Sequence, residues 1–314
     1  MKKELGISVL LLVLCAVTAG LNPKFVSPVN LGNMANVIGL FGIFSIGLGL
    51  VIITGGIDLS VGSMFALTGI LLAMALREWQ WPWPFAALMA IAIPMLLGWG
   101  HGALITRLHI QPFIITLCGL LIYRGLARFI ANDNTKGFGG SEGFGALREL
   151  AVGKFLGLPM PFVLLLAIAV VMWFVLHRST YGRYLFAVGR NEQAARFSGI
   201  NTRKVIAGSY IMAGFLTGVS GILLAFYTNS VSPSNHGNFY ELYGIAAAVL
   251  GGCSLRGGEG SIIGIVIGTA LLQVLQNLVN LLGIPSSLNF AVMGAVILIG
   301  VIADQLLKRR SALA

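Results

Sequence analysis

The sequence RSTYGRYLFAVGRNEQAARFSGINTRK, residues 178–204, separates two apolar segments and holds six of the chain's 20 lysine and arginine residues. The flanking segments approach the length of about 20 residues that crosses a bilayer as a helix. Loops rich in Lys and Arg between such segments stay on the cytoplasmic side. This loop therefore predicts a protein that spans the membrane several times, and it orients the spans.

The composition of the whole chain agrees with a membrane protein. Of the 314 residues, 57% are hydrophobic and 10% are charged, whereas soluble domains hold about 25% charged residues. The 42 glycines lie largely within apolar stretches, where small residues let transmembrane helices approach closely. The formal charge of +10 is explained by basic inner loops, so no nucleic-acid partner is predicted. The three cysteines show no metal-ligand spacing, and no metal or cofactor is predicted.

Ten apolar segments predict an all-α integral membrane protein with a single transmembrane domain over residues 1–314. The eighth segment is too short for a plain helical span. It either extends back through Phe239 and Glu241, or it is a broken or re-entrant helix buried against its neighbours. The ten predicted spans cover residues 5–21, 31–53, 59–76, 85–106, 112–131, 159–177, 205–229, 241–252, 261–282 and 287–305.

The distribution of basic residues orients these spans. With the amino terminus inside, both termini and the loop 178–204 are predicted to be cytoplasmic, and the loop 132–158 is predicted to be periplasmic. The inner segments then hold thirteen basic residues, namely Lys2, Lys3, Arg107, the six of the long loop, Arg256, Lys308, Arg309 and Arg310. The outer loops hold five, namely Lys24, Arg77, Lys136, Arg148 and Lys154.

The segment ITGGIDLSVGSMFALTG, residues 53–69, places an acidic residue between the second and third spans. An ionised carboxylate at the bilayer centre costs roughly 2.5–3.5 kcal/mol, so Asp58 needs a partner, water or a helix end. Either Asp58 caps the third span and accepts the amide of Ser60 or Val61, or it lies on the path of a transported solute. The sequence GGCSLRGGEGSIIG, residues 251–264, repeats this glycine pattern weakly, as the duplicated halves of transporters do.

The middle of the long basic loop predicts a short cytoplasmic helix. Asn191 is a typical N-cap, Glu192 lies in the first turn, and Gly199 ends the helix at C′. Such a helix is suited to insertion into a groove on another protein, and a basic loop that binds lipid headgroups is the alternative. The chain contains no GxxxxGK[ST] motif, so we predict that it is not an enzyme and has no nucleotide site of its own.

Several polar side chains lie within the predicted spans. Arg124 and Arg128 share one helix face near the outer end of the fifth span, and we expect both to reach along it to the interface. His101, Asn277 and Asn280 are expected to hydrogen-bond between helices, with a contact to the transported solute as the alternative.

Together these motifs resemble the permease subunits of bacterial ABC importers for monosaccharides, such as the ribose, xylose and galactose systems. The resemblance covers nearly the whole chain, from about Asn30 to Asp304, and its four stretches occur in the family's order. They are TGGIDLSVGS (54–63), PFIITL (112–117) with Arg124-Gly125, GRYLFAVGRNEQAARFSGIN (182–201) and AAAVLGGCSLRGGEGSIIG (246–264).

The resemblance implies a permease of the type II ABC importer architecture in the bacterial inner membrane, with about ten helices per subunit. A periplasmic sugar-binding protein would deliver the solute, and a cytosolic ABC ATPase would drive alternating access. A second permease subunit, identical or paralogous, would complete the channel within the membrane lipid. The solute would be a pentose, a hexose or a sugar-like molecule such as autoinducer-2.

The alternative function is a secondary transporter driven by an ion gradient. That function requires carboxylates along the pathway, and only Asp58, Glu241 and Asp304 are candidates.

The resemblance also assigns site residues. The stretch NEQAARFSGI, residues 191–200, is similar to the segment that docks on the ATPase as a coupling helix. The implied coupling residues are Asn191, Glu192, Ala194, Ala195, Arg196 and Gly199. Our candidates for the solute pathway are Gly55, Gly56, Asp58, Ser60 and Asn277.

Overall fold

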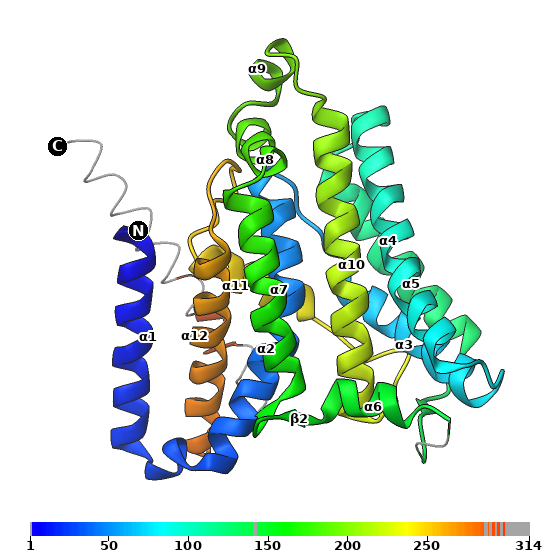
Figure 1. The fold of residues 1–314 in the computed structure, drawn as a ribbon, viewed down its shortest axis with the longest axis vertical. Coiled ribbons are helices and arrows are strands. Elements are labelled where there is room, and N and C mark those ends of the chain that lie inside the picture. Colours follow the sequence, from blue (N-terminus) through cyan, green and yellow to red (C-terminus); the bar gives the residue numbers. More distant parts are fainter. Residues whose placement is uncertain are drawn as a thin grey trace.

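Helices make up most of the molecule in a computed structural model that describes residues 2–140, 143–285 and six single residues between 288 and 298 (Figure 1). Most of the predicted tenth span, including Asp304, lies outside the described residues. The helices are α1 (Lys2–Leu21), the 3₁₀ helix η1 (Pro23–Val26), α2 (Pro28–Ile53), α3 (Val61–Arg77), α4 (Trp83–Leu108), α5 (Pro112–Ile130), α6 (Gly145–Val152), α7 (Met160–His177), α8 (Thr180–Arg190), α9 (Glu192–Phe197), α10 (Thr202–Thr228), α11 (Tyr240–Leu250) and α12 (Ile262–Leu281). The strands are β1 (Lys136–Gly137), β2 (Lys154–Phe155), β3 (Leu158–Pro159) and β4 (Ser230–Val231).

The predicted all-α class is confirmed, and the first nine predicted spans each coincide with one helix. Among the described residues, seven helices are long and apolar enough to cross a membrane, and α3 and α11 are shorter apolar helices. The predicted and observed ends of these helices differ by at most three residues. Apolar length and bounding turn residues therefore suffice to locate the spans.

Contacts between loops show that the long helices alternate in direction. Loops that should share one side of a membrane meet at one end of the bundle, and loops of the other side meet at the opposite end. At the end that carries α8 and α9, the Gly258 amide donates to Ile53 O at 2.8 Å, and the Ser261 hydroxyl donates to the Glu4 carboxylate. At the opposite end, Asn22 Nδ2 donates to Leu281 O at 3.0 Å, Lys136 Nζ lies 2.6 Å from Glu78 Oε1, and β1 pairs with β4.

Helix α2 is the centre of the bundle. Its sequence is apolar on every side, and 83% of the residues in its 18-residue apolar stretch are buried, as expected for a helix that is hydrophobic all round. It packs against α7, α10, α11 and α12. By contrast, only 6% of the residues in the corresponding stretch of α1 are buried. Helix α1 lies at the edge of the bundle against α12 (Figure 1).

Glycines bring α4 and α10 together along their length. Gly98 and Gly102 of α4 and Gly214 and Gly218 of α10 form two GxxxG pairs. A Cβ atom on Gly98 would overlap the backbone of α10, and one on Gly102 would lie 2.5 Å from an α-carbon of that helix. Without a hydrophobic driving force between helices in lipid, such close backbone approach supplies the packing energy.

Two pairs of polar side chains link helices inside the bundle. Asn30 of α2 and Asn277 of α12 exchange side-chain amide hydrogen bonds of 3.0 and 2.7 Å. His101 Nε2 of α4 lies 2.7 Å from Tyr123 Oη of α5. His101 and Asn277 thus serve the expected role of linking helices, whereas Asn280 is exposed.

The short helix α11 resolves the question raised by the eighth predicted span. Its 11 residues rise only about 16 Å. It does not extend back through Phe239, because that residue adopts a φ of +66°, which ends helical geometry for a non-glycine residue. The helix therefore takes in Glu241 but not Phe239, and the broken helix is the alternative that the structure supports.

Replacing Gly98 by alanine should destabilise the protein by about 1–3 kcal/mol, because the new methyl group forces α4 away from α10. Gly100 is the matched control, since it lies in the same helix with nothing within 4 Å of its Cβ position. Gly100→Ala should be neutral or stabilise by up to about 1 kcal/mol through helix propensity. Thermal unfolding in detergent measures both, and equal midpoints for the two variants would contradict this account of the α4–α10 seam.

Candidate functional site

The segment between α2 and α3, residues 54–60, runs inside the bundle without helical structure. Gly55 turns the chain with a φ of +83°, and Ile57 O accepts hydrogen bonds from Tyr210 Oη at 3.2 Å and Thr116 Oγ1 at 3.3 Å. Tyr210 lies eight residues into α10, which is about 12 Å of helix rise. Unwound backbone at that depth is tolerated only where protein groups satisfy it.

Asp58 is the buried acidic residue of this segment, with 2% of its surface exposed. Its Oδ1 accepts the Ser60 amide at 2.8 Å and the Ser60 hydroxyl at 2.6 Å. The predicted bond to the Ser60 amide is confirmed. The prediction that Asp58 itself is the N-cap is wrong, because Ser60 occupies that position before α3. Asp58 instead stabilises the turn that leads into the helix, as Asx turns do.

Arg124 of α5 binds the backbone at two breaks between helices. Its guanidinium donates to Pro233 O at 3.1 Å and His236 O at 2.9 Å, both in the loop before α11, and to Gly62 O at 3.2 Å in α3. The prediction that Arg124 reaches the interface is therefore wrong. The five donors of a guanidinium satisfy several carbonyls at once, which makes arginine suited to this position.

Arg128, one turn further along α5, does reach the surface as predicted. It is 53% exposed, and its Nε lies 2.6 Å from Asp133 Oδ1. The hydrogen bond from this guanidinium holds the pKa of the Asp133 carboxyl below its ordinary value. Sequence contained the signal that separates the two arginines, since Arg128 has an acidic residue five positions away and Arg124 has none nearby.

The first turns of α3 and α11 meet beside Arg124. Gly62 packs so closely on Gly237 and Glu241 that a Cβ atom on Gly62 would overlap Gly237 O and the Glu241 carboxylate. Glu241 is 6% exposed, and sequence reasoning considered it as an extension of the eighth span and as part of the ion-driven alternative. Helix amino termini carry partial positive charge, and in transporters such broken helices surround the solute site near the middle of the membrane.

The predicted pathway residues therefore divide into two groups. Gly55, Gly56, Asp58 and Ser60 lie together in the unwound segment, and Gly56 lies against Tyr210 Oη. Asn277 lies elsewhere, with its amide bound to Asn30. Among the described residues, no group of three or more His, Cys, Asp or Glu side chains is arranged to hold a metal ion.

The predicted short helix in the basic loop is confirmed as α9. Asn191 Oδ1 accepts the Ala194 amide at 2.9 Å, so Asn191 is the N-cap. Glu192 occupies the first turn, and Gly199 follows the C-cap with a φ of +83°, the left-handed conformation that ends helices. Ala195 is buried while its α9 neighbours are exposed, and α9 extends beyond the long helices (Figure 1).

Gly189 of α8 packs against both glycine motifs of the sequence. A Cβ atom on Gly189 would overlap Ile53 O and lie 2.5 Å from Gly258 N. One on Gly257 would lie 2.7 Å from Gly189 O and 2.9 Å from Gly55 N. The three motifs that the sequence singled out thus meet at one junction, and α8 rests directly on the turn that begins the unwound segment.

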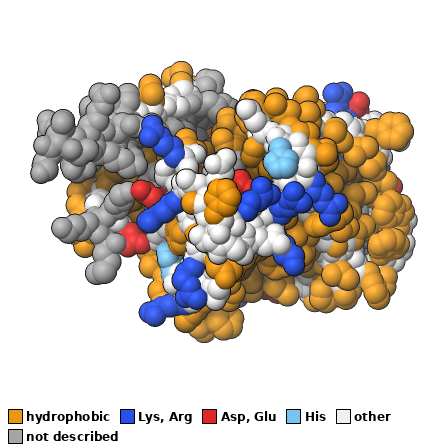
Figure 2. Space-filling model, turned by 90° about the horizontal axis from the view of Figure 1, so that it is seen from above, with side chains coloured by type: hydrophobic (Ala, Val, Ile, Leu, Met, Phe, Trp, Pro, Cys, Tyr) orange, Lys and Arg blue, Asp and Glu red, His pale blue; other side chains and the backbone are white. Residues whose placement is uncertain are grey.

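Positive side chains gather over the face that carries α8 and α9, as Figure 2 shows. Six of them belong to the loop 178–204 and are all exposed, namely Arg178, Arg183, Arg190, Arg196, Arg203 and Lys204. This face carries the charge expected of a surface that meets the cytosol.

The apolar helices form a bundle, and α3 and α11 begin inside it, which is the arrangement of a membrane permease with several spans. Comparison with known families identifies the class of permease. The family described as the permease component of branched-chain amino acid transport systems matches residues 30–301. The chain belongs to this family and is the membrane permease component of a bacterial ABC importer, as the motifs predicted. Such components lack the ATPase domain.

The relatives of the chain transport different solutes. The ribose import permease protein RbsC of Bacillus subtilis is 38% identical over 96% of this chain and 93% of its own length. The galactofuranose transporter permease protein YtfT of Escherichia coli is 32% identical over 87% of this chain and 78% of its own. The autoinducer 2 import system permease protein LsrD of an Enterobacter species is 32% identical over 86% of this chain and 82% of its own. No solved structure matches the chain.

Replacing Arg124 by glutamine should lower the unfolding free energy by at least about 2 kcal/mol, because carbonyls at two breaks lose a charged donor. Arg128→Gln is the matched control on the same helix and should change stability by less than about 1 kcal/mol, since exposed ion pairs contribute little. Thermal unfolding in detergent measures stability, and limited proteolysis of the loop 229–239 reports the local effect. An Arg124 variant as stable and as resistant to protease as the Arg128 variant would refute this role.

Proposed function

We propose that this chain imports a monosaccharide or a sugar-like solute across the bacterial inner membrane, driven by a separate cytosolic ATPase. The relatives named for ribose, galactofuranose and autoinducer 2 support this substrate class. A sugar presents several hydroxyl groups, and the unwound segment beside α3 and α11 offers polar side chains and backbone groups of the kind that bind hydroxyls.

The observation that carries the proposal is the junction of Gly189 with the two glycine motifs. The loop 178–204 is the cytoplasmic coupling loop, and α9 docks on the ATPase. Because α8 rests on the turns at residues 53–56 and 257–258, a displacement of α9 is transmitted to the segment that holds Asp58. Closing of the ATPase dimer thereby changes access to the site by a rigid-body movement. The coupling residues are Asn191, Glu192, Ala194, Ala195, Arg196 and Gly199.

The solute pathway in this proposal runs past Gly55, Gly56, Asp58 and Ser60. Asn277 is left out, because its amide links α12 to Asn30 of α2. Arg124 and Glu241 lie at the meeting point of α3 and α11 and hold the two half-helices around the pathway.

The remaining partners follow from this arrangement. The loop 132–158 faces the periplasm and contributes to the surface that receives a sugar-binding protein. Both termini are cytoplasmic. A second permease subunit, identical or paralogous, completes the channel, and membrane lipid surrounds the exposed apolar faces of helices such as α1, α4 and α7.

ATP-dependent uptake in proteoliposomes tests the proposed function. The permease is reconstituted with its ATPase and binding protein and offered a panel of pentoses, hexoses and autoinducer-2. We expect uptake of one solute that requires all three proteins and stops in Arg196→Glu while ATP hydrolysis continues. Uptake by the permease alone without ATP, or normal uptake by the Arg196→Glu variant, would overturn the proposal.

Crosslinking tests whether α8 and the second glycine motif move as one body. A Cβ atom at position 258 would lie 3.1 Å from Arg190 Cα, so an Arg190→Cys/Gly258→Cys pair should form a disulfide when oxidised. Because Gly258 has a φ of +75°, a cysteine there is strained, and the reduced pair must first show uptake. Because the two elements move together in this proposal, oxidation should leave uptake within about twofold of the uptake by the reduced protein, which is much less than a tenfold loss. Each single-cysteine variant under the same oxidant is the control. The native Cys15, Cys118 and Cys253 are replaced by alanine first, since Cys118 is exposed. Loss of uptake only in the oxidised pair would mean that the two elements separate during transport.

A further inference from the structure

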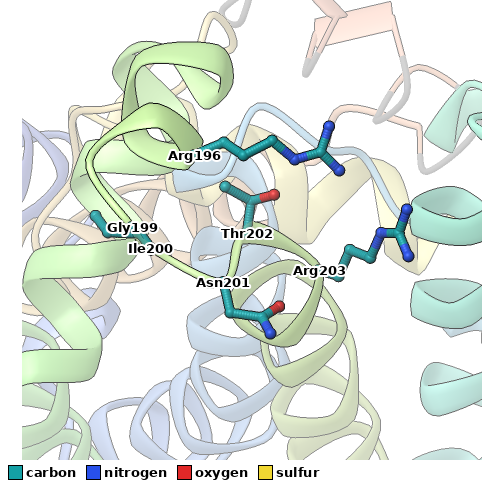
Figure 3. Close-up of a pocket in the computed structure, with 6 residues that line it drawn as sticks. All are labelled: Arg196, Gly199, Ile200, Asn201, Thr202 and Arg203. Atoms are coloured by element: carbon teal, nitrogen blue, oxygen red, sulfur yellow. The ribbon is translucent and has the colours of Figure 1, made fainter.

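A hollow of about 370 Å³ lies where the coupling loop passes from α9 into α10. Figure 3 shows the side chains of Arg196 and Arg203 extending to the same side of the chain, with Thr202 between them. In the described part of the chain, neither guanidinium has a hydrogen bond or an ion pair. The lining residues are Arg196, Gly199, Ile200, Asn201, Thr202 and Arg203.

The Thr202 hydroxyl is the unusual group in this hollow. Thr202 is only 2% exposed, yet its Oγ1 has no hydrogen-bond partner. Buried hydroxyls elsewhere in the bundle, such as those of Thr106 and Thr269, donate to the carbonyl four residues earlier in their helices. Thr202 is the first residue of α10 and has no such helical carbonyl before it. An unpaired buried hydroxyl is unfavourable, so an acceptor that reaches this group when a partner docks and opens the turn would stabilise it.

The chemistry of the lining selects the acceptor. Two guanidinium groups and a hydroxyl are all donors, and the planar guanidinium matches the geometry of a carboxylate or a phosphate. The ligand is therefore an anionic group of this shape.

The neighbouring residue distinguishes a protein ligand from a lipid. Phe197, next to Arg196 at the end of α9, is 91% exposed. It stands on α9, which extends past the ends of the long helices (Figure 1), where another protein can reach it. Exposed aromatic residues beside arginines are typical anchors of protein interfaces.

We propose that a carboxylate side chain of the ATPase subunit binds in this hollow, between Arg196, Arg203 and the Thr202 hydroxyl. Phe197 enters an apolar pocket of the same partner beside it. This inference rests on the proposed docking of α9 on the ATPase, and it adds the chemistry by which the partner is recognised.

Affinity of the purified ATPase for the full-length permease in nanodiscs of neutral phosphatidylcholine tests the inference. Removing one charged partner of a buried hydrogen-bonded pair weakens binding by about tenfold or more, so Arg196→Gln and Arg203→Gln should each do so. The weakening should shrink as the salt concentration rises. Arg183→Gln is the matched control, because Arg183 is an exposed arginine of the same loop that is bonded to Thr180 Oγ1 at 3.0 Å and lies outside the hollow. It should change the affinity less than about twofold.

Thr202→Val separates a ligand contact from a structural role. Valine has nearly the same shape and removes a hydroxyl that has no partner in the permease. The isolated variant should therefore unfold at the same or a higher temperature, while its affinity for the ATPase falls by about threefold to tenfold. Unchanged affinity in Thr202→Val and in both arginine variants would overturn the inference.

The failure of the docking proposal gives a different result. If α9 does not dock, Phe197→Ala will bind the ATPase as tightly as the wild type. If α9 docks without a carboxylate in the hollow, Phe197→Ala will weaken binding while the Arg203 and Thr202 variants will not. Binding that requires phosphatidylglycerol in the nanodisc, and that Arg203→Gln abolishes only there, would assign the hollow to a lipid phosphate and overturn the carboxylate ligand.

Discussion

Unwound backbone inside a membrane bundle must be satisfied by protein groups, and much of this fold depends on that constraint. Water does not reach the hydrocarbon region to pair free amides and carbonyls. Here Tyr210 and Thr116 donate to Ile57 O, and Arg124 donates to carbonyls on both sides of the contact between α3 and α11. These donors come from α5 and α10, so the breaks between helices remain stable only within the assembled bundle.

Close contacts of glycine backbones connect α8 to the unwound segment, and the proposed mechanism depends on them. The absence of a Cβ atom lets α8 lie against Ile53 O and against Gly258, and lets Gly62 lie against Gly237. Interfaces packed to this degree do not deform continuously, and they move as units. In the proposed mechanism, a force applied to α9 reaches the unwound segment through these contacts, even though Asp58 and α9 are far apart in sequence.

Local patterns predicted several parts of the site correctly. The N-cap Asn191, the first-turn Glu192 and the C′ Gly199 defined α9, because capping depends on residues within one turn of each other. The role of Arg124 was missed for the opposite reason. Its partners, Pro233, His236 and Gly62, lie 62 to 112 positions away, and no local spacing reports such contacts. The N-cap of α3 was predicted at Asp58, two residues before its observed position at Ser60, because the start of the helix depends on how other helices hold residues 57–60.

The sequence by itself determined the class of the protein and the positions of nine helices, since apolar length and caps act locally, and its basic loops predict the orientation. The tertiary structure decided which glycines touch, which arginine binds the backbone at the helix breaks and where α3 and α11 begin. Those features depend on distances between segments far apart in the chain. It also placed the unpaired Thr202 hydroxyl between two arginines. The sequence RFSGINTR contains all three residues, but only the turn between α9 and α10 brings their side chains to one side of the chain.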